Sequence, residues 1–354
     1  MLKHGGTIVT AVSSAPRLTP DQLREHIGRL PRIPGFALTP TPLEELPRLS
    51  EALGGPRLLM KRDDLTGFAF GGNKVRALEF RMADLRAKGC DTLVLVNIGQ
   101  SNHARLHAAA CRRLGLKMVL VKPGPKGERV QGNLLLDRML GIDIVETGTT
   151  DSADLDRILD EVLADLRQRG HKPYVHTRDP FSPVAGTVAF AEATIELLDQ
   201  LRALDSKADH VFLVAGSSAA GLALGGKLLG AGYSVHPVSV SSGAEATLRQ
   251  EVNLAQRACA ALGLPEVVSE ADFCVHADYV GEGYGRTPPE TLEAIRLAAR
   301  VEGVFLDPVY TGKAFSGLIG EIRRGHVRKD ETVVFVHTGG LPIIFAYDQV
   351  LAEL

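Results

Sequence analysis

The stretch FGGNKVRALEF, residues 70–80, places a lysine directly after two glycines and an asparagine, where a helical pattern begins. The pattern continues beyond this stretch. Its apolar residues have the spacing of one helix face and are Val75, Leu78, Met82 and Leu85. It therefore predicts a helix with Asn73 as the N-cap and Lys74 as its first residue.

Lys74 carries its charge at an unusual place. A helix N-terminus presents unpaired N–H groups and the positive end of the macrodipole, so it disfavours an ammonium group. A lysine there loses its proton more easily, and a neutral amine is the nucleophile that forms Schiff bases. This stretch alone leaves open the alternative that Lys74 reaches out to water and the glycines only make a turn.

The composition is that of an ordinary globular protein that can bury a large core. The chain has 354 residues, of which 45% are hydrophobic and 23% charged, enough for two domains. The 40 Lys and Arg nearly balance the 42 Asp and Glu, so no net charge attracts nucleic acid or an anionic membrane. We expect a small-molecule partner, with no nucleic acid and no membrane.

Targeting signals and cysteine pairs are weak or absent in the sequence. No apolar run approaches the ~20 residues of a membrane span, and residues 1–20 have too weak an apolar region for a signal peptide. The four cysteines form no C-x-x-C pair, so neither structural zinc nor a disulfide framework is indicated. We expect a cytoplasmic protein.

Strand-like runs alternate with helical patterns along most of the chain. Such alternation predicts an α/β fold with parallel sheets. The runs are TLVLVN (92–97), KMVLVK (117–122), IDIVET (142–147), HVFLVA (210–215), YSVHPVSVSS (233–242) and ETVVFVH (331–337). Residues 1–35 lack a strong period and are predicted to form an N-terminal arm.

Two loops follow predicted strands, where ligands bind in open α/β sheets. In GQSNHAR (99–105), Ser101 could face a substrate, or could only cap the following helix. In AGSSAAG (215–221), backbone N–H groups and serine hydroxyls could cradle a phosphate, or the small residues could serve close packing. This loop matches neither G-x-x-x-x-G-K-[ST] nor G-x-G-x-x-G, so it does not indicate a nucleotide.

Three more stretches combine glycines with polar side chains. HTGG (337–340) ends the last strong strand, while DYVGEGYG (278–285) and DPVYTGK (307–313) present Tyr284 and Tyr310. Each tyrosine, taken alone, could equally rest on the edge of the core.

Two carboxylate and histidine patterns do not indicate a site. His103 and His107 lie four residues apart, as in a metal pair, but the glutamate of H-E-x-x-H is missing. Asp63 and Asp64 are adjacent, so in a strand they would point to opposite faces. We expect no metal site.

The ordered set of motifs resembles a known family. KRDDLTGFAFGGNKVRALEF (61–80), GQSNHAR, DYVGEGYG and DPVYTGKAFSGLI (307–319) resemble the pyridoxal-phosphate enzymes of the aminocyclopropane-carboxylate deaminase and D-cysteine desulfhydrase family. The resemblance runs from about residue 40 to the C-terminus. It implies the two-domain parallel-sheet fold of the tryptophan-synthase-beta-like (fold type II) enzymes, in a homodimer. The large cofactor-binding domain would comprise 36–81 and 181–354, and the small domain 82–180.

The resemblance also implies roles for individual residues. Lys74 would form the Schiff base with pyridoxal phosphate (PLP), beside Asn73, and the phosphate would be held by Gly216, Ser217, Ser218 and Ala219. The substrate side would comprise Ser101, Asn102, His103, Tyr284 and Tyr310. The cofactor would act as an electron sink while a β-substituent leaves, giving a 2-oxo acid and ammonia.

Two threonines favour one branch of the family. Cyclopropane deaminases carry glutamate after the tyrosine of DPVY and leucine inside HxGG, whereas this chain has Thr311 and Thr338. Threonine at both positions resembles the D-cysteine desulfhydrase branch and implies a carbon–sulfur lyase. L-cysteate sulfo-lyase, aminocyclopropane-carboxylate deaminase and a non-catalytic ligand-binding protein are the alternatives.

Several positions depart from the family pattern. Ala77 stands where relatives have a lysine near the phosphate, Gly99 replaces an aliphatic residue, and Leu106 replaces a common glutamine. The phosphate loop also lacks its usual threonine and its Gln or His. These departures predict an altered cofactor and substrate pocket.

Overall fold

Two parallel sheets organise the chain. The computed structural model describes residues 17–352 and 354. The large sheet has the order β1-β2-β9-β7-β8 and is parallel except for β1, and the small sheet has the parallel order β5-β4-β3-β6. The strands are β1 (Leu43–Glu45), β2 (Arg57–Lys61), β3 (Thr92–Val96), β4 (Lys117–Lys122), β5 (Asp143–Glu146), β6 (Pro173–Val175), β7 (His210–Val214), β8 (Ser234–Val238) and β9 (Thr332–Val336). The predicted α/β fold is confirmed.

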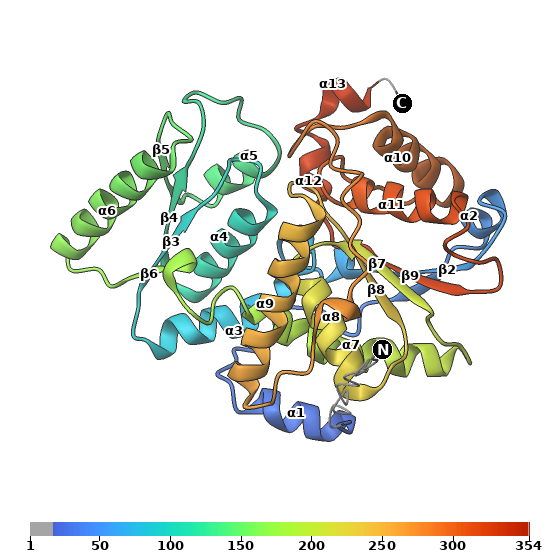
Figure 1. Cartoon of the computed structure of the whole chain (residues 1–354). Coiled ribbons are helices and arrows are strands. Elements are labelled where there is room, and N and C mark those ends of the chain that lie inside the picture. Colours follow the sequence, from blue (N-terminus) through green and yellow to red (C-terminus); the bar gives the residue numbers. More distant parts are fainter. Residues whose placement is uncertain (1–16, 353) are drawn as a thin grey trace, which may run out of the picture.

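Helices cover both sheets, which form two lobes (Figure 1). They are α1 (Pro20–Gly28), α2 (Pro47–Ala52), α3 (Lys74–Ala87), α4 (Asn102–Leu114), α5 (Gly132–Met139), α6 (Ser152–Gln168), α7 (Ala185–Ala203), α8 (Ser217–Leu229), α9 (Ala244–Leu262), α10 (Pro289–Glu302), α11 (Thr311–Arg323), α12 (Leu341–Ile344) and α13 (Asp348–Leu351). None of these described helices is long and apolar enough to cross a membrane.

The apolar strands are buried on both faces, as their sequence predicts. In β9, Val334 and Val336 pack in a core cluster with α7 and α8, whereas Val333 and Phe335 pack in a second cluster with α10 and α11. Parallel strands covered on both faces need continuous apolar runs rather than alternation. The loops at their ends therefore carry the polar side chains.

Helix α3 lies between the lobes. Its predicted apolar stripe, from Val75 to Leu85, packs in the core of the small sheet, while Phe80 packs in the core that contains α7. The helix continues through residue 82 without a break. The predicted boundary there, like the other predicted domain limits, stays a prediction.

Part of the predicted N-terminal arm is a packed helix. Thr19 and Gln22 form a capping box at the start of α1, and Leu23 and Ile27 are buried in the large core. The sequence does not predict α1, because only two buried apolar side chains mark this short helix. Residues 1–16, including most of the stretch considered for a signal peptide, lie outside the described residues.

Asp63 and Asp64 do not lie in a strand, contrary to the sequence interpretation. They form a 3₁₀ turn, Asp63–Leu65, and both are buried. Arg76 Nε lies 2.8 Å from Asp63 Oδ2, and its Nη2 lies 3.0 Å from Glu196 Oε1 on α7. Lys61 also pairs with Glu196.

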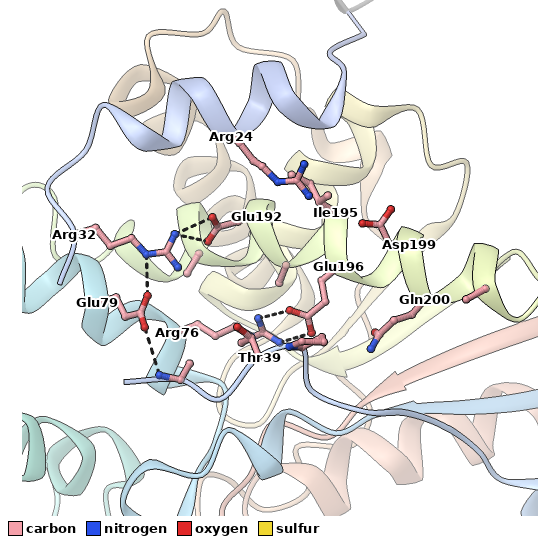
Figure 2. A pocket seen from close by; sticks show the side chains of 15 residues that line it. Arg24, Arg32, Thr39, Arg76, Glu79, Glu192, Ile195, Glu196, Asp199 and Gln200 are labelled. Atoms are coloured by element: carbon pink, nitrogen blue, oxygen red, sulfur yellow. Dashed lines mark hydrogen bonds and ion pairs between the residues drawn. The ribbon is translucent and has the colours of Figure 1, made fainter. Parts of the chain in front are cut away.

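This ion-pair network fixes the start of α3. Arg76 lies two residues after Lys74, and Figure 2 shows it bonded to Glu196, with Arg32 bonded to both Glu79 and Glu192 nearby. The two arginines thus hold α3 to α7. The network lines a separate cavity of about 490 Å³ beside α1 and α7.

The network predicts a pH-dependent loss of stability. Burial alone would raise the pKa of Glu196, but the bonds to Arg76 and Lys61 outweigh it and lower the pKa from 4.5 to about 2. The contribution of Glu196 is therefore present above pH 4.5 and is lost as the pH falls towards 2. We expect Glu196→Gln to reduce the unfolding free energy at pH 7 by about 3 kcal/mol, measured by urea denaturation.

Glu192→Gln is the matched control, because Glu192 lies one turn away on α7 and pairs with the more exposed Arg32. We expect it to cost less than about 1 kcal/mol. Equal losses in the two variants would contradict a special role for the Arg76 network.

Candidate active site

Two glycine-containing loops meet at Lys74. A Cβ atom on Gly339 would lie 2.7 Å from the Gly72 Cα, and both residues have positive φ, +94° and +122°. The Asn73 N–H donates to the Thr338 carbonyl at 3.1 Å. The glycines before the lysine therefore serve a close approach of two backbones, which only residues without side chains allow.

Arg105 holds the same loop from the small-sheet side. Its guanidinium donates to the carbonyls of Ala69 and, at 3.4 Å, of Gly71. Ala69 and Phe70 both have positive φ, 45° and 67°, which is strained for residues with side chains. Arg105, which the sequence did not single out, thus supports a strained loop before Lys74.

Most of the predicted site residues surround one cavity, which we call the Lys74 cavity. Its volume is about 340 Å³, and its wall includes Asn73, Lys74, Asn97, Ser101, Asn102, His103, His176, Gly216, Ser217, Ser218, Tyr310 and Thr338. Asn97 and His176 are additions that the sequence reasoning missed. Both come shortly after small-sheet strands, the position that drew attention to GQSNHAR.

Three predicted residues do not line this cavity. Ala219 is buried within α8, and Tyr284, which is 42% exposed, bonds through its hydroxyl to the Tyr310 hydroxyl. The Thr311 hydroxyl donates to Asp307 at 2.7 Å. Asp307 is fully buried and also accepts the Tyr310 N–H at 2.8 Å, so it positions both residues.

The surroundings of Lys74 favour its neutral form. Burial, followed by the charges of Arg81 and Arg105, lowers its pKa to about 8, although Asp307 acts in the opposite direction. The predicted direction is thus present, with burial as its main cause. The Lys74 Nζ lies 3.4 Å from Asn73 Oδ1, and Asn73 donates to Ser218 Oγ at 2.7 Å.

Ser101 caps a helix and lines the cavity, and its contact with a substrate stays a prediction. Its hydroxyl accepts the Ala104 N–H at 3.1 Å as the N-cap of α4, and the residue also lines the Lys74 cavity. Asn102 accepts a bond from Asn133 at 2.9 Å, which fixes its amide.

Three histidines stack beside the cavity. The ring of His103 lies 4.1 Å from that of His107 and 4.6 Å from that of His176, centroid to centroid. Burial lowers the pKa of all three, so they are neutral. Within the described residues, no group of three or more His, Cys, Asp or Glu side chains could hold a metal ion.

The departures at Gly99 and Leu106 have local explanations. A Cβ on Gly99 would lie 2.8 Å from Glu128, whose carboxylate pairs with the buried Lys122 at 3.2 Å. Gly99 therefore makes room for an ion pair. Leu106 is buried in the small-sheet core.

The start of α8 is open to an anion. The N–H groups of Ser217 and Ser218 are the first two of this helix, and no acceptor for them lies among the described residues. The Gly216 N–H donates instead to the buried Glu251, whose pKa burial raises to about 8. Glu251 is thus mostly protonated at neutral pH, so it leaves the helix start favourable to negative charge.

Comparison with known proteins identifies the family. The family model for pyridoxal-phosphate dependent enzymes matches residues 36–339. The chain belongs to this family.

Relatives within the family place the chain more closely. It is 37% identical to the 1-aminocyclopropane-1-carboxylate deaminase of Burkholderia ambifaria, over 92% of this chain and 98% of that protein. It is also 37% identical to the D-cysteine desulfhydrase of Klebsiella pneumoniae, over 91% and 98%. The chain therefore belongs to the group that contains these two enzymes.

A solved structure agrees with this placement. The crystal structure of an aminocyclopropane-carboxylate deaminase homologue has a TM-score of 0.84 and 33% identity, and the match covers 95% of this chain and 99% of that one. The fold is that of the tryptophan-synthase-beta-like PLP enzymes, as the resemblance implied, and PLP is the family's cofactor.

The contact between the two loops predicts a selective effect of one added methyl group. Gly339→Ala forces the loops apart, because the nearest obstacle is backbone. We expect it to lower the unfolding free energy by about 2 kcal/mol more than Gly232→Ala, measured by urea denaturation. Gly232 is a matched control because it has φ of +81° and no atom within 4 Å of the added Cβ. Equal losses would mean that positive φ alone, and not the contact, requires glycine at 339.

Proposed function

We propose that this PLP enzyme is a lyase that eliminates a β-substituent from a small amino acid, with D-cysteine as the first candidate. D-cysteine and water would give pyruvate, hydrogen sulfide and ammonia. The observation that carries this proposal is that no Asp or Glu lines the Lys74 cavity within the described part of the chain, where Thr338 contributes a neutral hydroxyl. Asp307 does not line this cavity, and it accepts a hydrogen bond from the Thr311 hydroxyl.

A cavity wall without a carboxylate suits elimination of a good leaving group. A carboxylate beside the pyridine nitrogen keeps that nitrogen protonated, whereas a hydroxyl does so less firmly. Opening a carbon ring places a greater demand on the electron sink than loss of sulfide does. The absence of a lining carboxylate among the described residues therefore favours a sulfur leaving group.

The residues present fit the cofactor. Lys74 supplies the amine for a Schiff base, Asn73 lies beside it, and the open N–H groups of Ser217 and Ser218 suit the phosphate. When bound, PLP supplies the electron sink that stabilises negative charge at the substrate Cα.

Lys74 and Tyr310 are placed to move protons. A lysine with a pKa of about 8 can accept the proton from the substrate Cα once its amine is free. Burial raises the pKa of Tyr310 well above 10, so its phenol stays protonated, and the Lys74 Nζ lies 5.7 Å from the centre of its ring. We assign Tyr310 as the group that protonates the departing sulfur, with Tyr284 holding its hydroxyl.

Ser101, Asn102 and His103 would orient the substrate. They lie at the N-terminus of α4, which favours a carboxylate. The neutral His103 adds a polar group without a competing charge.

A second candidate reaction is ring opening of 1-aminocyclopropane-1-carboxylate. The identity of 37% to the Burkholderia ambifaria enzyme, equal to that with the Klebsiella enzyme, favours testing it. L-cysteate is a third substrate of the same reaction type as D-cysteine.

Release of the 2-oxo acid tests the proposal. Purified, cofactor-loaded protein is offered D-cysteine, L-cysteine, L-cysteate and 1-aminocyclopropane-1-carboxylate separately. We expect pyruvate and sulfide from D-cysteine, at a kcat/KM at least about tenfold above any other substrate of the panel. 2-Oxobutyrate from the cyclopropane as the main product would refute the proposed leaving group.

The role of Lys74 has its own test. Lys74→Ala should abolish the visible Schiff-base absorption of the loaded protein and lower 2-oxo acid release at least about a thousandfold. Lys207→Ala, at an exposed lysine, should change neither. Parental turnover by the Lys74 variant would exclude this lysine from the chemistry.

A further inference from the structure

Arg81 on α3 is a buried cation with no carboxylate partner in the part of the chain that the structure describes. It is 5% exposed, its Nε donates to the Ser182 carbonyl at 2.7 Å, and its Nη1 has no hydrogen-bond partner among the described residues. Burying a guanidinium without a counter-charge is costly. The arrangement therefore calls for an anion.

The guanidinium faces a cavity next to the Lys74 cavity. This inner cavity, of about 250 Å³, is lined by Arg81, Ala77 and Gly186, and it shares Lys74, Ser217 and Ser218 with the Lys74 cavity. The two cavities thus meet at the start of α8.

Gly186 shows how closely Arg81 and Ser217 face the same space. A Cβ built on Gly186 would lie 2.3 Å from Ser217 Oγ and 3.8 Å from Arg81 Nη2. A side chain at 186 would fill the region between the helix start and the guanidinium. Glycine in the first turn of α7 keeps this region open.

Ala77 stands where relatives carry a lysine near the cofactor phosphate, so in this chain another residue must supply that positive charge. It precedes Arg81 by one helical turn, so both side chains lie on one face of α3. Alanine carries no charge, and its short side chain leaves the guanidinium free access to the inner cavity.

We propose that Arg81 binds the phosphate group of PLP together with Ser217 and Ser218, and so replaces the lysine that relatives carry at position 77. The proposal rests on the cofactor position given above and does not depend on which amino acid is the substrate. A guanidinium donates two parallel bonds to phosphate oxygens, which a lysine cannot do.

The charges around Arg81 agree with this role. Burial lowers the pKa of Arg81 to about 10, and only Tyr174 acts in the opposite direction. The positive charge of Arg81 also lowers the pKa values of His103, His107 and His176. A phosphate dianion would offset this excess of positive charge.

Comparing two forms of the cofactor tests the proposal. PLP and pyridoxal, which lacks the phosphate, are titrated separately into the cofactor-free parent and Arg81→Gln proteins, and Schiff-base absorption is followed. We expect Arg81→Gln to weaken PLP binding about tenfold to a hundredfold and to change pyridoxal binding less than about twofold. Equal weakening of both would show a merely structural role and overturn the proposal, as would unchanged PLP binding.

A second variant restores a positive charge at position 77, where relatives carry a lysine. Ala77→Lys added to Arg81→Gln should recover most of the PLP affinity without affecting pyridoxal, and failure to recover it would count against the proposal. Arg86→Gln, at an exposed arginine of the same helix, is the matched control and should leave both affinities unchanged.

Arg81→Lys covers the case in which Arg81→Gln does not fold. Lysine keeps the positive charge but lacks the planar guanidinium group. We therefore expect weaker PLP binding and unchanged pyridoxal binding. Equal weakening of PLP binding and pyridoxal binding would overturn the proposal. Because these titrations contain no substrate, a negative result in the 2-oxo acid panel would leave their outcome unaffected.

Discussion

The approach of the Gly72 and Gly339 backbones is the constraint on which the candidate site depends. It joins the loop before Lys74 to the loop after β9, and so brings together residues that lie far apart in the sequence. Arg76 adds a second attachment, from the first turn of α3 to α7. The lysine is therefore held by packing and by buried ion pairs rather than by its own contacts.

An excess of positive charge surrounds the cavity that these contacts create. Lys74, Arg81 and Arg105 lie close enough for each arginine to lower the pKa of the lysine. The lining residues of the described chain offer no carboxylate to balance them. Such a site is costly to build without ligands, and it suits a cofactor phosphate and a substrate carboxylate. Burial, together with this excess of positive charge, lowers the pKa values of Lys74 and the three histidines and so favours their neutral forms, which can accept protons.

The sequence predicted the elements that carry strong local signals. The start of α3 at Lys74 and the parallel strands followed from apolar periodicity, and most candidate site residues line one cavity because loops after parallel strands meet at one edge of a sheet. Arg81 was missed because nothing in its local sequence distinguishes a buried arginine from a solvated one. His176 follows strand β6 and Asp307 lies in DPVYTGK, so both had a positional signal, but their residue types alone did not mark them as part of a site. Helix α1 was missed because nine residues with two buried apolar side chains give no strong period. Asp63 and Asp64 were misplaced because a 3₁₀ turn has no sequence signature of its own.

The position of α3 between the lobes has a consequence for motion. One side of this helix belongs to the small-sheet core, its other side is tied to α7, and Lys74 stands at its tip. A rotation of one lobe against the other must therefore roll the helix about its long axis or slide it along α7. Either displacement also moves the Lys74 amine, so the relative motion of the two lobes and the position of the nucleophile are coupled.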